Sequence, residues 1–335
     1  MIDLEKTIPR RPMPSPSPAD GAPKARVLFV DDEPRVLTTM RMLFRGRYDV
    51  YFAESGAAAL ELLKSQPIDV IVSDQRMPGM TGIEMLRAAR ELNPSAMRIL
   101  LTGYSDLNAI IGSINEGEIF RFVSKPWAND ELSTTVARAV VAARASAAAE
   151  AKAAAEAGTE PALQISPQAP NLLVLDDDPR VPPQIQAILG AGYRVFGATT
   201  MDEAVDLLEK ERIGVVISDT RVQDHPVLGL IGTLKQHHPE LVSVILTERA
   251  DAGQAIELIN QGQIYRFITK PIHDNVCKIT VNSALKQHQK LTHNPELHQR
   301  YEVERTAPPP PTASAAAGAG LLDRIRSLRS WVTRR

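Results

Sequence analysis

A repeat with a constant offset of 145 positions constrains the fold of this 335-residue chain more than any other feature. The stretch from Ile114 to Pro126 reads INEGEIFRFVSKP, and the stretch from Ile259 to Pro271 reads INQGQIYRFITKP. The same offset relates Asp31 to Asp176, Asp32 to Asp177, Asp74 to Asp219, Thr102 to Thr247, and Lys125 to Lys270. Chance does not keep one register without gaps over this length, so the sequence predicts a tandem duplication of one domain.

Short apolar runs alternate with helical patterns inside each copy. In the first copy the runs predict strands over 27–30, 48–53, 69–73, 97–101 and 119–123. The segments between them have helical apolar spacing, and a long helix is expected from Asn129 onward. Alternation of this kind favours an α/β fold with a parallel sheet covered on both faces.

Composition shifts divide the rest of the chain. Residues 1–25 are rich in proline and are expected to be a disordered tail. The first domain is expected over 26–142 and the second over 171–290. Between them, 143–170 is predicted to be an Ala-rich helical stalk and a linker, because alanine is the best helix former. An unstructured Ala-rich linker is the alternative, since isolated helices of this length are marginal in water.

The C-terminal part is expected to continue the last helix to about Glu304 and then to form a Pro/Ala/Gly linker, over 291–320 together. Residues 321–335 combine helical apolar spacing with five arginines and predict a basic amphipathic helix. Three interpretations of this helix stay open: docking to a partner, weak and reversible contact with a membrane surface, and a solvated tail.

Composition excludes several classes of protein. The net charge of −2 gives no overall field that would favour nucleic acid, so no direct nucleic-acid binding is expected. A single cysteine, Cys277, cannot form an internal disulfide and is typical of a reducing cytosol. The N-terminus lacks the apolar core of a signal peptide, and no apolar run is long enough to cross a bilayer. We therefore expect a cytoplasmic protein.

Polar residues follow four of the predicted strands in the first copy. Asp31 and Asp32 follow the first strand, Asp74 the third, Thr102 the fourth and Lys125 the fifth. The carboxyl ends of parallel strands converge on one crevice, so these side chains are expected to meet. Three close carboxylates need a cation, and hard oxygen ligands beside a phosphate acceptor suit Mg²⁺. Asp74 would then act as a nucleophile toward phosphorus, with Lys125 and Mg²⁺ stabilising the transferred charge.

Four separated motifs resemble the receiver domains of two-component response regulators. They are Val30-Asp31-Asp32, Ser73-Asp74-Gln75-Arg76-Met77-Pro78-Gly79, Leu101-Thr102-Gly103 and Val123-Ser124-Lys125-Pro126. The resemblance implies two flavodoxin-like (βα)5 doubly wound domains with five-stranded parallel sheets of order 2-1-3-4-5. The first copy looks like receivers attached to HD-GYP phosphodiesterases and to hydrogenase-type regulators, but neither kind of output domain is found in the sequence.

The resemblance also implies roles for individual residues. Asp31, Asp32, Asp74 and the Arg76 carbonyl would bind Mg²⁺. Asp74 would be the phosphoacceptor, Thr102 and Lys125 would contact the phosphoryl group, and Phe122 matches an aromatic switch position. In the second copy the corresponding residues are Asp176, Asp177, Asp219, Thr247, Lys270 and Phe267. The phosphoryl donor would be a histidine kinase or a phosphotransfer protein.

The second copy departs from the pattern around its aspartate. Met77-Pro78 becomes Val222-Gln223, Gly82 becomes Val227, and Gly103 becomes Glu248. Phosphorylation of Asp219 and a degenerate receiver retained for pairing therefore both stay open. Pro182 and Pro183 are also expected to delay the start of the first helix of this copy.

Three functions follow as hypotheses. The first is a non-enzymatic response regulator with tandem receivers and no separate output domain, which acts through phosphorylation-dependent protein contacts, including receiver–receiver pairing or dimerisation. The second is a scaffold that binds through the second receiver and the C-terminal helix. The third, an aspartyl-nucleophile phosphatase, lacks the Asp-x-Asp spacing of haloacid-dehalogenase-like enzymes. The alternative to all three is a flavodoxin-like domain whose carboxylates are solvated and carry out no chemistry. Cys277 and the His237-His238 pair are expected to be structural.

Overall fold

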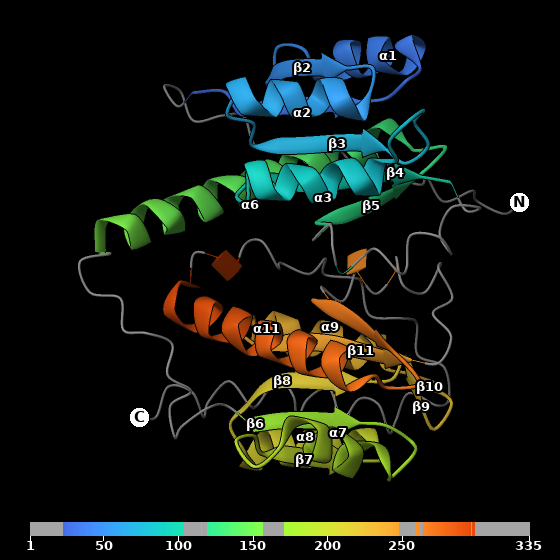
Figure 1. Ribbon diagram of the computed structural model, residues 1–335, viewed down its shortest axis with the longest axis vertical. Coiled ribbons are helices and arrows are strands. Elements are labelled where there is room, and N and C mark those ends of the chain that lie inside the picture. Colours follow the sequence, from blue (N-terminus) through green and yellow to red (C-terminus); the bar gives the residue numbers. More distant parts are fainter. Residues whose placement is uncertain are drawn as a thin grey trace, which may run out of the picture.

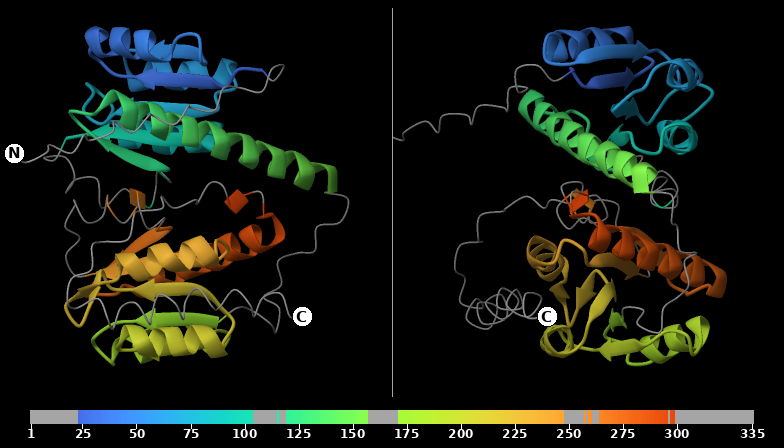
Figure 2. Two further views of the ribbon diagram at one scale, coloured as in Figure 1. Left: turned by 180° about the vertical axis from the view of Figure 1, so that it is seen from behind. Right: turned by 90° about the vertical axis from the view of Figure 1, so that its left-hand side faces the viewer.

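The computed structural model of the protein describes residues 23–103, 115, 119–156, 171–247, 257, 259–260, 264–295 and 297–298. Within these ranges the chain forms two α/β units stacked one on the other (Figures 1 and 2). The predicted tail, most of the linker and the C-terminal amphipathic segment lie outside the described residues, as do residues 104–114 and 116–118 of the helical segment expected between the fourth and fifth strands.

The first unit is built on a parallel sheet with strand order β2-β1-β3-β4-β5, as expected. The strands are β1 (Arg26–Val30), β2 (Asp49–Ala53), β3 (Val70–Asp74), β4 (Met97–Thr102) and β5 (Arg121–Ser124). All residues of β3 and β4 are buried. Both strands are apolar on both faces because helices cover the sheet from both sides.

Two apolar layers enclose this sheet. On one face α1 (Pro34–Phe44) and α6 (Asn129–Glu156) bury residues such as Phe44 and Val136 against Phe29 and Ile99. On the other face α2 (Gly56–Ser65) and α3 (Gly82–Leu92) pack against Ile71 and Leu100. In Figure 2 the far end of α6 runs well beyond the sheet, as an Ala-rich helix of 28 residues can.

The second unit repeats this topology with strand order β12-β11-β8-β6-β7. Its main elements are β6 (Asn171–Leu175), α7 (Val181–Leu189), β7 (Val195–Ala198), α8 (Met201–Lys210), β8 (Ile213–Ser218), α9 (Leu228–His237), β11 (Val242–Thr247), β12 (Arg266–Thr269) and α11 (Asp274–His293). A short antiparallel hairpin of β9 (Arg221–Val222) and β10 (His225–Pro226) has no counterpart among the named strands of the first unit. Helix α7 starts at Val181, two residues later than the repeat offset of α1 requires, as the two prolines predict.

One expectation about the helices is wrong. The last helix does not continue to Glu304: α11 ends at His293, and the amide of Asn294 caps it by donating to the Lys290 carbonyl. Asn294 precedes Pro295, and the residue before a proline is disfavoured in helical conformation. Among the described residues, no helix is both long enough and apolar enough to span a membrane.

Candidate functional site

The polar strand ends of the first unit come together at one edge of the sheet. Asp74 is the last residue of β3 and Thr102 the last of β4, while Asp31 and Lys125 directly follow β1 and β5. Because all five strands are parallel, their carboxyl ends share this edge. The convergence expected from the sequence is present for Asp31, Asp74 and Lys125, which are in direct contact.

Lys125 links the two buried aspartates. Its Nζ lies 3.1 Å from Asp31 Oδ2 and 2.5 Å from Asp74 Oδ1. Backbone amides hold the other two carboxylate oxygens: Glu33 donates to Asp31 Oδ1 at 2.9 Å, and Arg76 donates to Asp74 Oδ2 at 2.9 Å. The two carboxylates are therefore fixed in orientation, with the Lys125 ammonium between them.

Burial dominates the electrostatics of this group. It raises the pKa of Asp31, and the amide of Glu33 and the ammonium of Lys125 only partly offset that rise. Burial alone would lower the pKa of Lys125, but hydrogen bonds and charge from Asp74 and Asp31 outweigh it, so the Lys125 pKa is raised. The site thus keeps its lysine charged, and Asp31 is a carboxylate for which a further cation would be favourable.

An open hollow lies beside the aspartates. It is lined by Asp32, Gln75, Arg76, Met77, Pro78 and Thr81. Asp32 adds a third carboxylate at its wall, so the donor chemistry matches the oxygen ligands that Mg²⁺ prefers. Within the described ranges, however, no three acidic, His or Cys side chains are already gathered as ligands of a metal ion. Lys125 takes up one oxygen of each buried aspartate in this arrangement.

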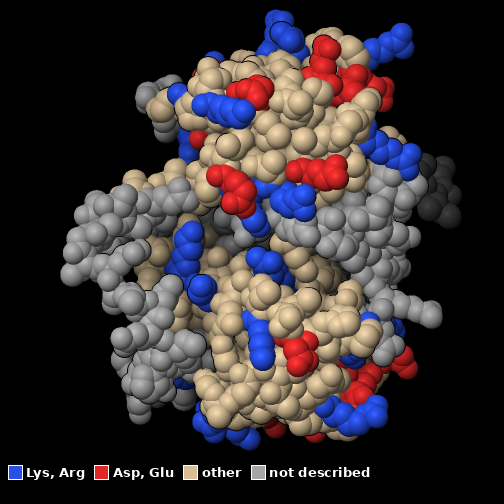
Figure 3. Space-filling model, in the orientation of Figure 1, with Lys and Arg blue, Asp and Glu red and all other residues tan. Residues whose placement is uncertain are grey.

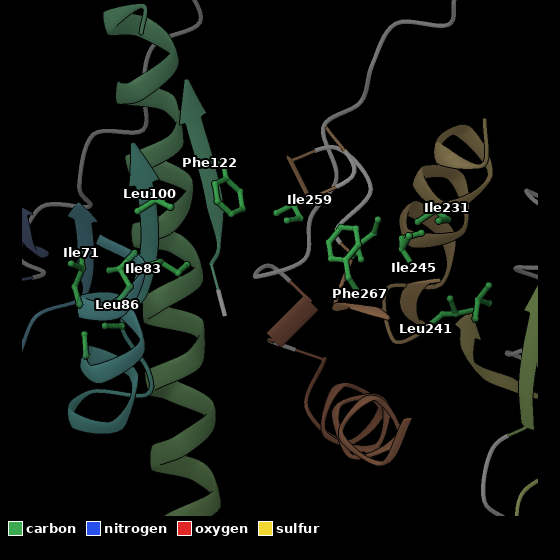
Figure 4. Close-up of a cluster of buried hydrophobic side chains, with 14 of the residues drawn as sticks. Ile71, Ile83, Leu86, Leu100, Phe122, Ile231, Leu241, Ile245, Ile259 and Phe267 are labelled. Carbon is green, nitrogen blue, oxygen red and sulfur yellow. The ribbon is translucent and has the colours of Figure 1, made fainter. Parts of the chain in front are cut away.

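The two expected switch residues lie on neighbouring strands. Thr102 is buried, and its hydroxyl donates to the Gly103 carbonyl at 3.3 Å. Phe122 is buried on β5 and points toward the second unit, where Figure 4 shows it opposite Ile259 and Phe267. Phe122 therefore belongs to the contact between units as well as to the strand that leads to Lys125.

Two residues that hold the site together were not singled out from the sequence as positioning residues. Gln75 accepts the Ile83 amide on its side chain at 3.1 Å and the Gly82 amide on its carbonyl at 3.0 Å, which ties the start of α3 to Asp74. A Cβ at Gly82 would lie 2.0 Å from the Asp74 carbonyl oxygen, so only glycine fits there. The polar residue directly after the strand-end aspartate was the available signal for Gln75.

The charged residues of the second unit keep the same core arrangement. Lys270 Nζ lies 2.7 Å from Asp176 Oδ2 and 3.0 Å from Asp219 Oδ2. As at Lys125, burial alone would lower the Lys270 pKa, but bonds to the two aspartates raise it. Phe267 is buried on β12, and Thr247 ends β11 with its side chain outside the described residues.

The loop after Asp219 differs from its counterpart. Thr220 donates both its amide, at 2.6 Å, and its hydroxyl, at 3.1 Å, to Asp219 Oδ1. The Gln223 amide donates to Asp177 Oδ1 at 2.7 Å, and Gln223 and Asp224 have left-handed φ angles of 48° and 59°. Donors of the loop after Asp219 therefore occupy one oxygen each of Asp177 and Asp219, although Asp177 is exposed and Asp219 is partly exposed.

Cys277 packs in the core, as expected. It lies on α11, fully buried in the apolar layer against the sheet, and burial raises the pKa of its thiol to about 11. His238 Nδ1 lies 3.4 Å from Glu240 Oε1 at the end of α9.

Basic and acidic side chains are interspersed over both units on the face drawn in Figure 3.

Comparison with known proteins identifies the repeated unit. The family model described as the response regulator receiver domain matches residues 27–137 and again 172–282, which together make up most of the chain. The two matches start 145 positions apart, in agreement with the internal repeat.

Curated relatives match over about one domain. The hydrogenase transcriptional regulatory protein HoxA of Cupriavidus necator is 43% identical over 119 residues, which are 36% of this chain and 25% of that protein. The DNA-binding transcriptional regulator NtrC of Escherichia coli is 39% identical over 87 residues, 26% of this chain and 18% of its own length. The chain thus spans about a quarter or less of these relatives.

Solved structures give matches of the same extent. The signal receiver domain of an HD domain-containing protein from Pseudomonas fluorescens Pf-5 is 35% identical and covers 38% of this chain and 93% of its own, with a TM-score of 0.36. An adenylate cyclase from Rhodopirellula baltica is 32% identical and covers 41% of this chain and 99% of its own, with a TM-score of 0.37.

Proposed function

Since the chain belongs to the response regulator receiver family, with two copies of that domain, we propose that it is a response regulator whose phosphoacceptor is Asp74. The observation that carries this proposal is the contact of Lys125 with both Asp31 and Asp74 beside an open hollow. A fixed ammonium next to a strand-end carboxylate is placed to stabilise the oxygens of an incoming phosphoryl group.

The transfer step proposed for this site conserves charge and electron count. An Asp74 carboxylate oxygen attacks the phosphorus of a phosphohistidine in a kinase or phosphotransfer protein. The new O–P bond forms as the N–P bond breaks, and the bonding pair stays on the donor nitrogen, which takes up a proton from water and leaves as imidazole. Lys125 then exchanges part of its contact with Asp74 for the phosphoryl oxygens, and the Thr102 hydroxyl donates to one of them.

Asp31, Asp32, Asp74 and the Arg76 carbonyl are the residues proposed to hold Mg²⁺. When bound, the ion would neutralise charge on the phosphoryl oxygens and on the clustered carboxylates. The raised pKa of Asp31 supports this assignment, because burial penalises that carboxylate until a cation compensates it.

We propose that the signal leaves the protein through protein contacts. The strand β5 carries Phe122 and leads directly to Lys125, so a change at Lys125 acts on the same strand that meets the second unit. Such a switch requires phosphorylation to favour one arrangement by a few kcal/mol.

Labelling of the full chain with acetyl phosphate and Mg²⁺ tests the assignment of Asp74. Asp74→Asn is expected to remove most of the label, whereas Asp49→Asn, an exposed aspartate on β2, should leave it unchanged. Label that survives Asp74→Asn in full would reject the proposal. The label lost in Asp219→Asn measures the share of the label that the second copy carries.

The second unit supports a scaffold role as the other candidate. Its Asp177 and Asp219 are engaged by Gln223 and Thr220 of the hairpin loop, which favours binding over phosphotransfer there. Deletion of 305–335 and Asp74→Asn separate the candidates. A scaffold is expected to lose its output when 305–335 is deleted but to keep it in Asp74→Asn. A phosphorylation-driven regulator is expected to lose that output in Asp74→Asn. Capture of partners with and without beryllofluoride would identify the target.

A further inference from the structure

Each sheet turns an edge strand toward the other unit. Strand β5 is the last strand of the first sheet, and β12 is the last strand of the second. An edge strand presents peptide N–H and C=O groups that no neighbouring strand of its own sheet pairs with. Burying such an edge without partners costs about 1–3 kcal/mol for each unpaired group. The partners of these groups therefore decide whether the two edges can be buried together.

Asn260 of the second unit pairs with Phe122 on β5. Its Nδ2 donates to the Phe122 carbonyl at 2.8 Å, and its Oδ1 accepts the Phe122 amide at 3.0 Å. One primary amide thus satisfies both backbone groups of one residue, as a peptide group of an added strand would.

Asn115 of the first unit makes the same contact in the opposite direction. Its Nδ2 donates to the Phe267 carbonyl on β12 at 2.7 Å, and its Oδ1 accepts the Phe267 amide at 2.8 Å. Arg266 adds a bond from its guanidinium to the Asn115 carbonyl at 3.1 Å. We call these four Asn–Phe bonds the asparagine clamp.

The clamp follows the repeat. Asn260 lies 145 positions after Asn115, and Phe267 lies 145 positions after Phe122, so the same two residues of each copy meet each other. This is an isologous contact of the kind found in two-fold symmetric dimers, here within one chain.

Apolar side chains seal the clamp. Phe122 and Phe267 are 1% and 3% exposed, and Ile259 next to Asn260 is 4% exposed. One buried apolar cluster includes all three and extends into both units (Figure 4). The four hydrogen bonds therefore lie beside groups sheltered from water, where an unpaired amide is costly.

We propose that the second receiver is the resident partner of the first, and that the asparagine clamp closes the β5 and β12 edges against each other in a pseudo-dimer within one chain. The edge of β5 is then available to another protein only after the units separate. This inference goes beyond the proposed function and does not depend on phosphorylation of Asp74.

Amide hydrogen exchange of the full chain tests the clamp, because a substitution in one unit should change the exchange rate of an amide in the other unit. Asn260→Ala is expected to accelerate exchange of the Phe122 amide on the order of tenfold, as loss of one net hydrogen bond implies. Asn115→Ala should do the same at Phe267. The Phe29 amide on the central strand β1 reports whether the whole unit has been destabilised.

Asn93→Ala is the matched control, because Asn93 bonds the Ile68 carbonyl inside the first unit at 2.7 Å. Asn93→Ala should leave the exchange rates of the Phe122 and Phe267 amides unchanged. Equal exchange at these two amides in the wild type and in both clamp variants would overturn the proposal. Protection of Phe122 must also be independent of protein concentration. Protection that falls on dilution, together with a dimer in sedimentation, would place the contact between copies and overturn the intrachain assignment.

Discussion

The two copies hold the same charged side chains but treat them differently after the strand-end aspartate. In the first unit the amide of Arg76, two residues after Asp74, donates to the carboxylate. In the second unit the donor is Thr220, one residue after Asp219, with both its amide and its hydroxyl. A shift of one residue in the donor accompanies a second loop that forms the β9–β10 hairpin.

A single backbone group explains much of this difference. Pro78 has no N–H to donate, whereas Gln223 at the matching position donates its amide to Asp177. Asp32, the counterpart of Asp177, lines the hollow. Two sites with the same charged side chains therefore differ in which carboxylate oxygens already accept hydrogen bonds, because the loop beside each site supplies different donors.

The largest expected effect comes from giving the first unit the side chain of the second at position 82. Gly82→Val would force a Cβ onto the Asp74 carbonyl, and we expect it to lower the free energy of unfolding by about 3 kcal/mol. The second unit carries Val227 at this position, where its loop forms the β9–β10 hairpin. Urea unfolding measures the change. Gly229→Ala, where a Cβ meets no atom within 4 Å, is the control, and equal stability of Gly82→Val and the wild type would contradict the expected clash.

Replacing the lysine of each site by alanine is expected to affect phosphoryl labelling differently at the two sites. Lys125→Ala should lower the rate of acetyl phosphate labelling about 100-fold, the scale for loss of one charged donor to the transferred group. Lys270→Ala should change total labelling little, because hydrogen bonds from Thr220 and Gln223 already occupy Asp219 and Asp177. Lys64→Ala, an exposed lysine paired with Glu61, controls for loss of charge. Similar losses for Lys125→Ala and Lys270→Ala would show that the two sites are equivalent.

A buried lysine gives the second unit a pH response that its counterpart, Arg90, does not provide. Lys235 is 3% exposed and donates to the Leu241 carbonyl. Burial lowers its pKa from 10.5 to about 7, although Glu240 opposes the shift. Between these values the unfolded chain binds a proton that the folded chain does not, so stability from this group rises with pH.

Lys235→Met should therefore be more stable than the wild type by about 2 kcal/mol at about pH 7, and the difference should shrink toward about pH 10. Urea unfolding of both proteins at the two pH values measures this difference in stability. Groups that titrate alike in both proteins contribute equally to each, so they do not affect the difference. A gap of the same size at both pH values would show that Lys235 does not titrate as expected.

The smallest effect concerns the start of the helix after the site. Thr81 and Glu84 form a capping box on α3, while α9 in the second unit has no side-chain cap. Thr81→Ala is expected to cost about 1 kcal/mol of unfolding free energy. Urea unfolding measures this change, and Thr38→Ala, on the exposed face of α1, should be neutral by the same measurement. A neutral Thr81→Ala would mean that the cap does not distinguish the two helices.

The fold and the charged centre were predictable because they depend on local signals. Strand runs and the repeat register predict two parallel sheets, the resemblance to receiver domains implies the strand order, and the shared carboxyl edge of a parallel sheet brings Asp31, Asp74 and Lys125 together. The late start of α7 follows from Pro182 and Pro183 alone. The early end of α11 was missed although Pro295 marks it.

Contacts between the units could not be predicted in the same way. Asn115 and Asn260 stand in the best-matched part of the repeat, but a sequence does not show which groups an edge strand leaves unpaired or what covers them. The role of Gln75 likewise depends on how closely α3 approaches β3, which the Gly82 contact sets. Both are properties of packing between elements rather than of any one element.

The isologous contact has a consequence for the history of the chain. A surface that binds its own copy needs only one ancestral gene, because each favourable substitution acts twice across a symmetric interface. Fusion of two such copies fixes them at high effective concentration and frees each from its role in the other. The loop beside the aspartate of one copy can then change without loss of the contact between the units, and the Gln223 loop beside an intact Asn260 contact is the arrangement expected of such a copy.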